Sequence, residues 1–163
     1  MWFRRKPKPD PASAARGLRD QALSLAAEDL GLTPTLEHPH LWAILMETGY
    51  PQIVASLFSA TDGTTSLYLS TGGGVIGAGA HESVGATLPL FFAAAEANLT
   101  SFSMAPSTPP PGEGRVRFYL RTFDGTLTAE ASEQDLGQKR HPLWPVFHAG
   151  QAVIAAVRQA SGG

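Results

Sequence analysis

Cysteine is absent from the 163-residue sequence. Disulfides, thiolate catalysis and zinc or iron–sulfur sites built on cysteine are therefore excluded. The absence also suits a reducing compartment, so we expect a cytoplasmic protein. Charged residues are few, at 16% with a net charge of −2, which gives no electrostatic reason to expect a nucleic-acid partner. No apolar run approaches the roughly 18–20 residues of a membrane-spanning helix.

Residues 1–9 combine two aromatic side chains with four cations and two prolines. No apolar segment follows the charges, so we expect neither a signal peptide nor a transmembrane segment here. The pattern favours a flexible basic tail. The alternative is weak contact with acidic lipid, at about 1 kcal/mol per cation near the surface. Residues 10–163 are predicted to form a single globular α/β domain, which is an ordinary length for one core.

Residues 51–79 contain the clearest structural signal. Two runs rich in β-branched and apolar residues flank Asp62-Gly63, which predicts a hairpin with a two-residue turn. Its register would place Phe58 opposite Leu67, and Leu57 opposite Tyr68. The first strand is apolar on both sides, which is typical of a central strand with helices packed on both faces of the sheet.

A second hairpin is predicted over residues 115–131, around Asp124-Gly125. The first strand alternates cleanly between apolar and polar residues. The expected register places Leu120 opposite Ala129 and Tyr119 opposite Glu130, with arginines diagonal to that carboxylate.

Helical spacing and helix-end signals predict the remaining elements. Pro89 either kinks the helix that contains it or marks its true first turn. The expected elements are helices over 10–30, 39–47, 81–98 and from 141 or 142 to 159, a short strand within 99–104, a Pro-rich loop over 105–114 and a polar connection over 132–140. The predicted class is α/β (α+β), with one mainly antiparallel sheet of about five strands and helices on both faces.

The glycine-rich bend over residues 72–79 is the main candidate for ligand chemistry. Gly72, Gly74 and Gly77 have the bare spacing of a dinucleotide fingerprint, and Gly73 and His81 lie beside them. The preceding strand belongs to a hairpin, however, and no parallel βαβ unit follows, so the fingerprint lacks its context. The same glycines suit an ordinary bend that needs positive φ angles. The bend therefore has two interpretations: it is either a nucleotide or anion site or a bend with a purely structural role.

Signals for other chemistry are sparse. His38, His40 and Glu37 are metal-ligand residue types but lack the spacing of a metal motif, so neither a metal nor a cofactor is predicted. No nucleophile elbow is visible. An enzyme using His81 and Glu82 is a third hypothesis, although the sequence favours a protein without catalytic activity.

The polar side of the second hairpin carries Arg117, Tyr119 and Arg121. Such a row either is the solvated face of an edge hairpin or binds phosphate or an acidic partner.

The element order resembles the roadblock/dynein-light-chain domain and its profilin-like relatives. ASLFSATDGTTSLYLSTGGG, GRVRFYLRTFDGTLTAEA and HPLWPVFHAGQAVIAAVRQ carry the resemblance, which covers most of residues 50–160. It implies a non-enzymatic scaffold or regulator that dimerises through a helix and a strand edge, often acting on small GTPases. The first hypothesis is therefore a self-associating interaction or regulatory module with an unknown protein partner. The alternative is a small-ligand or nucleotide binder that uses the glycine bend.

Overall fold

The computed structural model describes residues 10–162, which form one seven-stranded antiparallel sheet with helices on both faces. The strand order is β4-β3-β2-β1-β6-β7-β5. The basic tail predicted over residues 1–9 lies outside the described residues. The elements are α1 (Pro11–Ser24), β1 (Leu41–Tyr50), β2 (Ile53–Ala60), β3 (Thr65–Leu69), β4 (Gly74–Val75), α2 (Glu82–Gly85), α3 (Leu88–Ala97), β5 (Ser103–Met104), β6 (Arg115–Thr122), β7 (Gly125–Ser132), α4 (Glu133–Gly137) and α5 (Trp144–Ala160).

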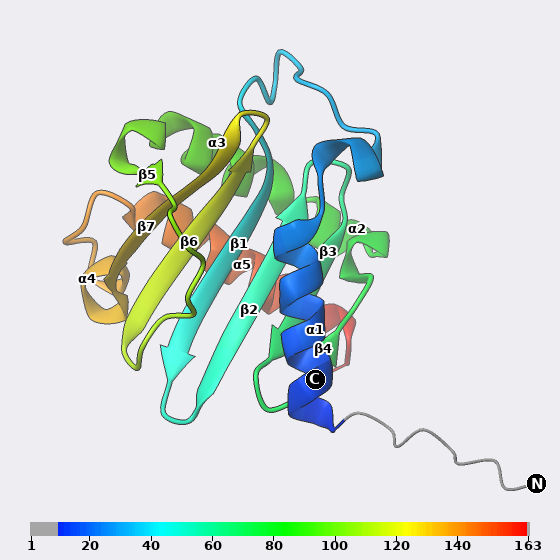
Figure 1. Cartoon of the computed structure of the whole chain (residues 1–163), viewed down its shortest axis with the longest axis vertical. Helices are drawn as coiled ribbons and strands as arrows, with labels where there is room; N and C mark the ends of the chain where they lie inside the picture. The colour runs from blue at the N-terminus through cyan, green and yellow to red at the C-terminus, as the bar shows by residue number, and fades with distance from the viewer. Residues whose placement is uncertain (1–9, 163) are drawn as a thin grey trace, which may run out of the picture.

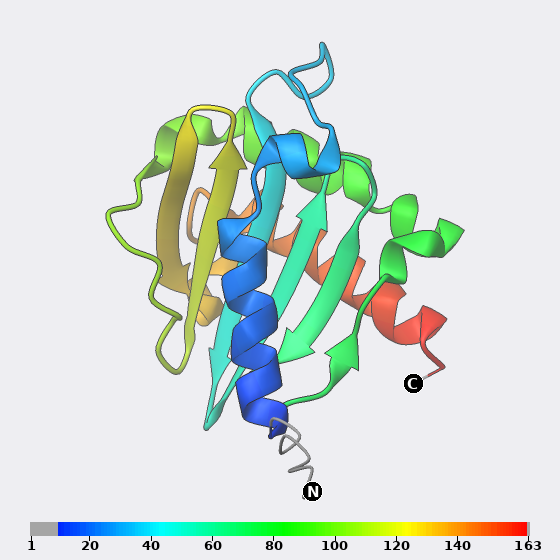
Figure 2. The same ribbon diagram turned by 45° about the vertical axis from the view of Figure 1, so that its right-hand side comes forward.

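The sheet separates two apolar layers. Helix α1 crosses one face, and α3 and α5 pack on the opposite face (Figures 1 and 2). The larger core lies under α3 and α5, whereas the smaller core lies under α1. The α+β class and the helices on both faces are therefore confirmed. Strands β1 and β4, which were not predicted, raise the strand count from about five to seven.

The helix predicted over residues 39–47 is wrong, because the chain forms β1 there. Every position of β1 is buried except Tyr50. A short run of apolar residues is compatible both with a buried helix and with a strand that is covered on both faces. Its periodicity therefore could not distinguish the two. Strand β1 holds the middle of the sheet, and β2, which was expected at the centre, lies beside it.

The first hairpin forms with a register one residue away from the prediction. Leu57 pairs with Leu67, and Phe58 pairs with Ser66. The cause is a loop of three residues, 61–63, closed by a hydrogen bond from the Ala60 amide to the Thr64 carbonyl. Gly63 supplies the positive φ, +98°, that this loop requires. Leu57 and Leu67 therefore both face the larger core, since a one-residue change moves a side chain to the other face.

The second hairpin forms with a register two residues away from the prediction. Phe118 pairs with Ala129, and Leu120 pairs with Leu127, because residues 123–124 form the turn in place of Asp124-Gly125. A shift of two keeps every side chain on its predicted face. The apolar side of β6 is accordingly buried in the larger core as predicted. Glu130 lies opposite Arg117 rather than opposite Tyr119.

Most of the other predicted helices and loops form, with some ends displaced. Asp10 caps α1 by accepting a 2.7 Å hydrogen bond from the Ser13 amide, although α1 ends at Ser24, before the predicted Leu30. Pro89 lies in the first turn of α3, so the late helix start is confirmed and the kink is excluded. Residues 105–114 form no helix or strand, as predicted. The connection over 132–140 contains the short helix α4.

Within residues 10–162, no helix has the length and apolar character needed to cross a membrane.

Two glycine substitutions are expected to change stability in opposite directions. A Cβ at Gly79 would collide with the carbonyl group of Gly63, so we expect Gly79→Ala to lower the free energy of unfolding by about 1–3 kcal/mol. Gly17 lies within α1 with open space around its Cα, so Gly17→Ala should raise the free energy of unfolding by up to about 1 kcal/mol. Urea denaturation measures both, and equal effects of the two substitutions would contradict this packing.

Candidate functional site

Four polar residues form one line across the α1-facing side of the sheet. Glu47 on β1 pairs with Arg117 on β6 and with Ser56 on β2, which in turn pairs with Tyr68 on β3. Directly paired residues point to the same side of a sheet, so these four side chains lie next to one another beneath α1. We call Arg117, Glu47, Ser56 and Tyr68 the polar row.

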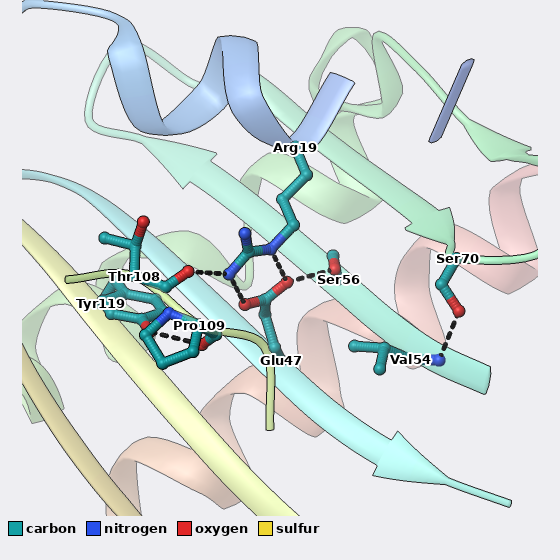
Figure 3. Close-up of polar contacts among 8 residues, drawn as sticks. All are labelled: Arg19, Glu47, Val54, Ser56, Ser70, Thr108, Pro109 and Tyr119. Atoms are coloured by element: carbon teal, nitrogen blue, oxygen red, sulfur yellow. Dashed lines mark hydrogen bonds and ion pairs between the residues drawn. The ribbon is translucent and has the colours of Figure 1, made fainter. Parts of the chain in front are cut away.

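A buried ion pair ties α1 to this row. Nε of Arg19 donates to Oε2 of Glu47 at 2.8 Å, and Nη2 donates to Oε1 at 2.9 Å (Figure 3). Ser56 Oγ donates a third hydrogen bond to Oε2 at 2.7 Å. The Glu47 side chain is fully buried, and that of Arg19 is 17% exposed. A carboxylate in this position needs such partners, since an unpaired buried charge is very costly.

The Pro-rich loop closes over the same ion pair. Nη2 of Arg19 also donates to the Thr108 carbonyl at 2.7 Å, and the Tyr119 hydroxyl donates to the Pro109 carbonyl (Figure 3). Burial alone would lower the pKa of Arg19, but the hydrogen bonds and charge of Glu47 raise it above its ordinary value. Arg19 therefore stays a cation and links α1, β1 and the loop through a single guanidinium group.

Tyr68 ends the polar row without a hydrogen-bond partner. Its side chain is buried and its hydroxyl has none within the described part of the chain. Burial, reinforced by the charge of Glu47, raises the pKa of Tyr68 well above its usual value, so the hydroxyl keeps its proton. The ring borders a cavity of about 300 Å³ between α1 and the sheet. Other residues around this cavity include Ala15, Arg19, Glu47, Val54 and Ser56.

Two of the predicted ligand-binding glycines border a second hollow, which is separate from this cavity although Tyr68 lines both. Gly73 and Gly74 border a smaller hollow of about 230 Å³, together with the first turns of α1. No lysine or arginine lines this hollow within residues 10–162, so it has no side-chain cation to neutralise a phosphate. Gly77 and His81 do not line it, and His81 is exposed.

The backbone explains why this bend contains glycine. Gly72, Gly73 and Gly74 all have positive φ angles, and a Cβ at Gly72 would overlap Pro11 at the start of α1. The bend turns the chain into β4, not directly into a helix as expected, and β4 is antiparallel to β3. The context of a dinucleotide fingerprint is therefore missing. A nucleotide or anion site at residues 72–79 stays a prediction.

The arginine and tyrosine row that was expected at the surface is largely covered by the Pro-rich loop and by the C-terminal end of α1. Tyr119 is fully buried, and Arg121 donates to the carbonyls of Ala22 at 2.9 Å and Leu25 at 2.7 Å. Burial lowers the pKa of Arg121. Arg117 donates to Glu130 at 2.8 Å, as expected for a carboxylate that balances the row. The prediction of a solvated edge face was wrong, because the Pro-rich loop covers Tyr119 and the C-terminal end of α1 accepts the hydrogen bonds of Arg121.

The histidine-based sites do not assemble. Residues 10–162 contain no group of three His, Cys, Asp or Glu side chains placed to hold a metal ion. His81 and Glu82 are both exposed at the start of α2, and neither lines the two hollows beneath α1.

Comparisons with protein-family models, curated proteins and solved structures found no significant match to this chain. The resemblance to roadblock domains therefore stays a prediction.

A double-mutant cycle should reveal the strength of the Arg19–Glu47 pair. Arg19→Met leaves a buried carboxylate without its cation, and we expect it to cost about 3–5 kcal/mol of unfolding free energy. Replacing both residues, with Arg19→Met and Glu47→Leu, should recover much of that loss, because no unpaired charge remains. Urea denaturation supplies the four free energies.

The exposed pair of Arg140 and Asp135, 2.9 Å apart, is the matched control. Arg140→Met should change the unfolding free energy by no more than about 1 kcal/mol. A double variant at Arg19 and Glu47 that loses the full sum of its two single losses would contradict the coupling.

Alkaline pH should destabilise the protein partly through Tyr68. Its pKa is raised in the folded state, so the folded protein holds this proton more tightly than the unfolded chain. The resulting stability is fully present below the unfolded tyrosine pKa of about 10 and is lost as the pH rises above it. We expect the unfolding free energy to fall between neutral and strongly alkaline pH, and to fall less in Tyr68→Phe. An equal fall of the unfolding free energy in the unaltered protein and in Tyr68→Phe would exclude a contribution of Tyr68 to the alkaline destabilisation.

Proposed function

We propose that the chain is a non-catalytic interaction module that self-associates through the outer surface of α3. The observation that carries the proposal is that α3 is apolar on both sides. Its inner side contributes Leu88, Phe91 and Phe92 to the larger core. Its outer side exposes Leu90, at 68%, beside Ala93.

The single charged residue of α3 does not serve the outer surface. Oε1 of Glu96 accepts hydrogen bonds from the backbone amides of His40 at 3.2 Å and Leu41 at 3.1 Å. The carboxylate is thus used to hold the start of β1. A surface helix normally carries charged residues on its outer side, and a helix that is apolar all round is normally buried. Burial of the outer side of α3 by a second copy of the chain would meet this expectation.

Helix α5 extends the weakly charged surface. It packs against α3, and Arg158 is its single charged residue. Ala152 and Ala155 are exposed along it. The two helices together offer a broad surface with little charge, which is characteristic of interface centres. The dimerisation through a helix that the roadblock resemblance implies agrees with this choice of surface.

The polar row favours a structural role over catalysis. Glu47 accepts three hydrogen bonds from Arg19 and Ser56, and the Ser56 hydroxyl donates to that carboxylate. A general base needs a free lone pair aimed at a reacting proton, and a nucleophile needs a base to receive its own proton. Glu47 is already neutralised by Arg19, so the row suits the positioning of α1 and of the Pro-rich loop.

Leu90→Glu should separate self-association from folding. A carboxylate in the middle of an apolar contact would have to be desolvated, so we expect the variant to be a folded monomer where the unaltered protein is a dimer. Ile76→Glu is the matched control, because Ile76 is 67% exposed but lies next to β4. Sedimentation velocity at micromolar to millimolar concentration measures the mass. A strictly monomeric unaltered protein, or equal effects of the two variants, would refute the proposal.

A further inference from the structure

Helix α1 covers its face of the sheet with few buried side chains. Of its 14 residues, Ala15 and Ala22 are the two that are buried, whereas α5 buries seven residues on the opposite face (Figure 2). Leu18 and Leu23 add partly buried contacts. The stabilisation from apolar contact grows with the buried area, and alanine has a small side chain. Separating α1 from the sheet therefore costs much less than separating α5.

Two hollows lie between α1 and the sheet. The cavity of about 300 Å³ and the hollow of about 230 Å³ are both bordered by Ala15 and Tyr68. Native cores contain few voids larger than a water molecule, and side chains that face a void lose dispersion contacts on that side. The contact between α1 and the sheet is therefore looser than that of a core helix.

The polar tethers of α1 lie in its second half. Arg121 donates to two carbonyl groups at the C-terminal end of the helix. Arg19 forms the next tether, to Glu47. Among the described residues, no hydrogen bond joins residues 11–18 to the sheet. The C-terminal end of α1, from which the connection over residues 25–40 leads to β1, is therefore the natural pivot for the rest of the helix.

The Arg19–Glu47 pair fixes where α1 lies without holding it tightly. When α1 leaves the sheet, both charged groups return to water, and the hydration that each regains offsets much of the attraction that is lost. A variant that lacks one partner differs, because the remaining charge stays buried while α1 is in place. The pair therefore specifies the closed position and still permits release of the helix.

We propose that α1 is a lid over the polar row. It opens about its C-terminal end while the sheet, α3 and α5 stay folded, and its opening exposes Glu47 and the strands around it to solvent. One helix thereby controls access to the buried carboxylate. The motion is independent of the proposed self-association, which uses the opposite face of the sheet.

Single cysteines test the lid, because the chain has no cysteine of its own. Ala15→Cys reports on the opening of α1, and Ala149→Cys, at the same 5% exposure in α5, is the matched control. The reagent is a polyethylene glycol maleimide, which is far larger than the cavity and reacts only when the helix moves away. We expect Ala15→Cys to be labelled at least about a hundredfold faster than Ala149→Cys. Its rate should depend little on low concentrations of urea, since local opening exposes little surface.

Arg19→Met should speed the labelling of Ala15→Cys by at least about tenfold, because the closed helix then covers an unpaired carboxylate. Arg140→Met, which removes an exposed ion pair, should leave the rate unchanged. Equal labelling rates of Ala15→Cys and Ala149→Cys, with equal urea dependence, would show that α1 leaves the sheet only on global unfolding and would overturn the lid. If Ala15→Cys combined with Arg19→Met does not fold, the comparison of the two cysteine variants decides alone.

Discussion

A carboxylate buried in the central strand is the constraint on which the α1 side of this molecule depends. Glu47 lies in the middle of the sheet, where an unpaired charge would cost several kcal/mol, on the order of 3–5. Arg19 from α1 neutralises it through two hydrogen bonds and reaches the Thr108 carbonyl with the same guanidinium group. The position of α1 and the path of the Pro-rich loop follow from this one charge pair.

The two faces of the sheet consequently differ in character. On the α1 face, a polar row is covered by a helix and a loop, and its unpartnered tyrosine borders a small cavity. On the other face, α3 and α5 complete a mainly apolar core, in which Thr48, Ser59 and Thr65 are the buried polar residues, and turn a weakly charged surface outward. The proposed self-association uses the second face and leaves the polar row untouched.

The sequence predicted the elements whose signal is local. Alternation identified β6 and its buried side, Pro89 marked the start of α3, and helical spacing located α5. Both hairpin registers were missed, because the turn position depends on one or two residues at the loop. The site was missed because it is non-local: Arg19 and Glu47 are 28 residues apart. Glu47 inside an apolar run was the available clue, since a buried acid requires a distant cation.

The central claim is that the Arg19–Glu47 pair holds α1 and the Pro-rich loop on the sheet together. Amide hydrogen exchange of Glu47→Gln compared with the unaltered protein tests it most directly. The pair predicts that protection falls in α1 and at the hydrogen-bonded loop amides of Ala105 and Gly114, while the amides of β7 and α5 keep theirs. Unchanged protection in α1, or an equal loss throughout the sheet and helices, would contradict it.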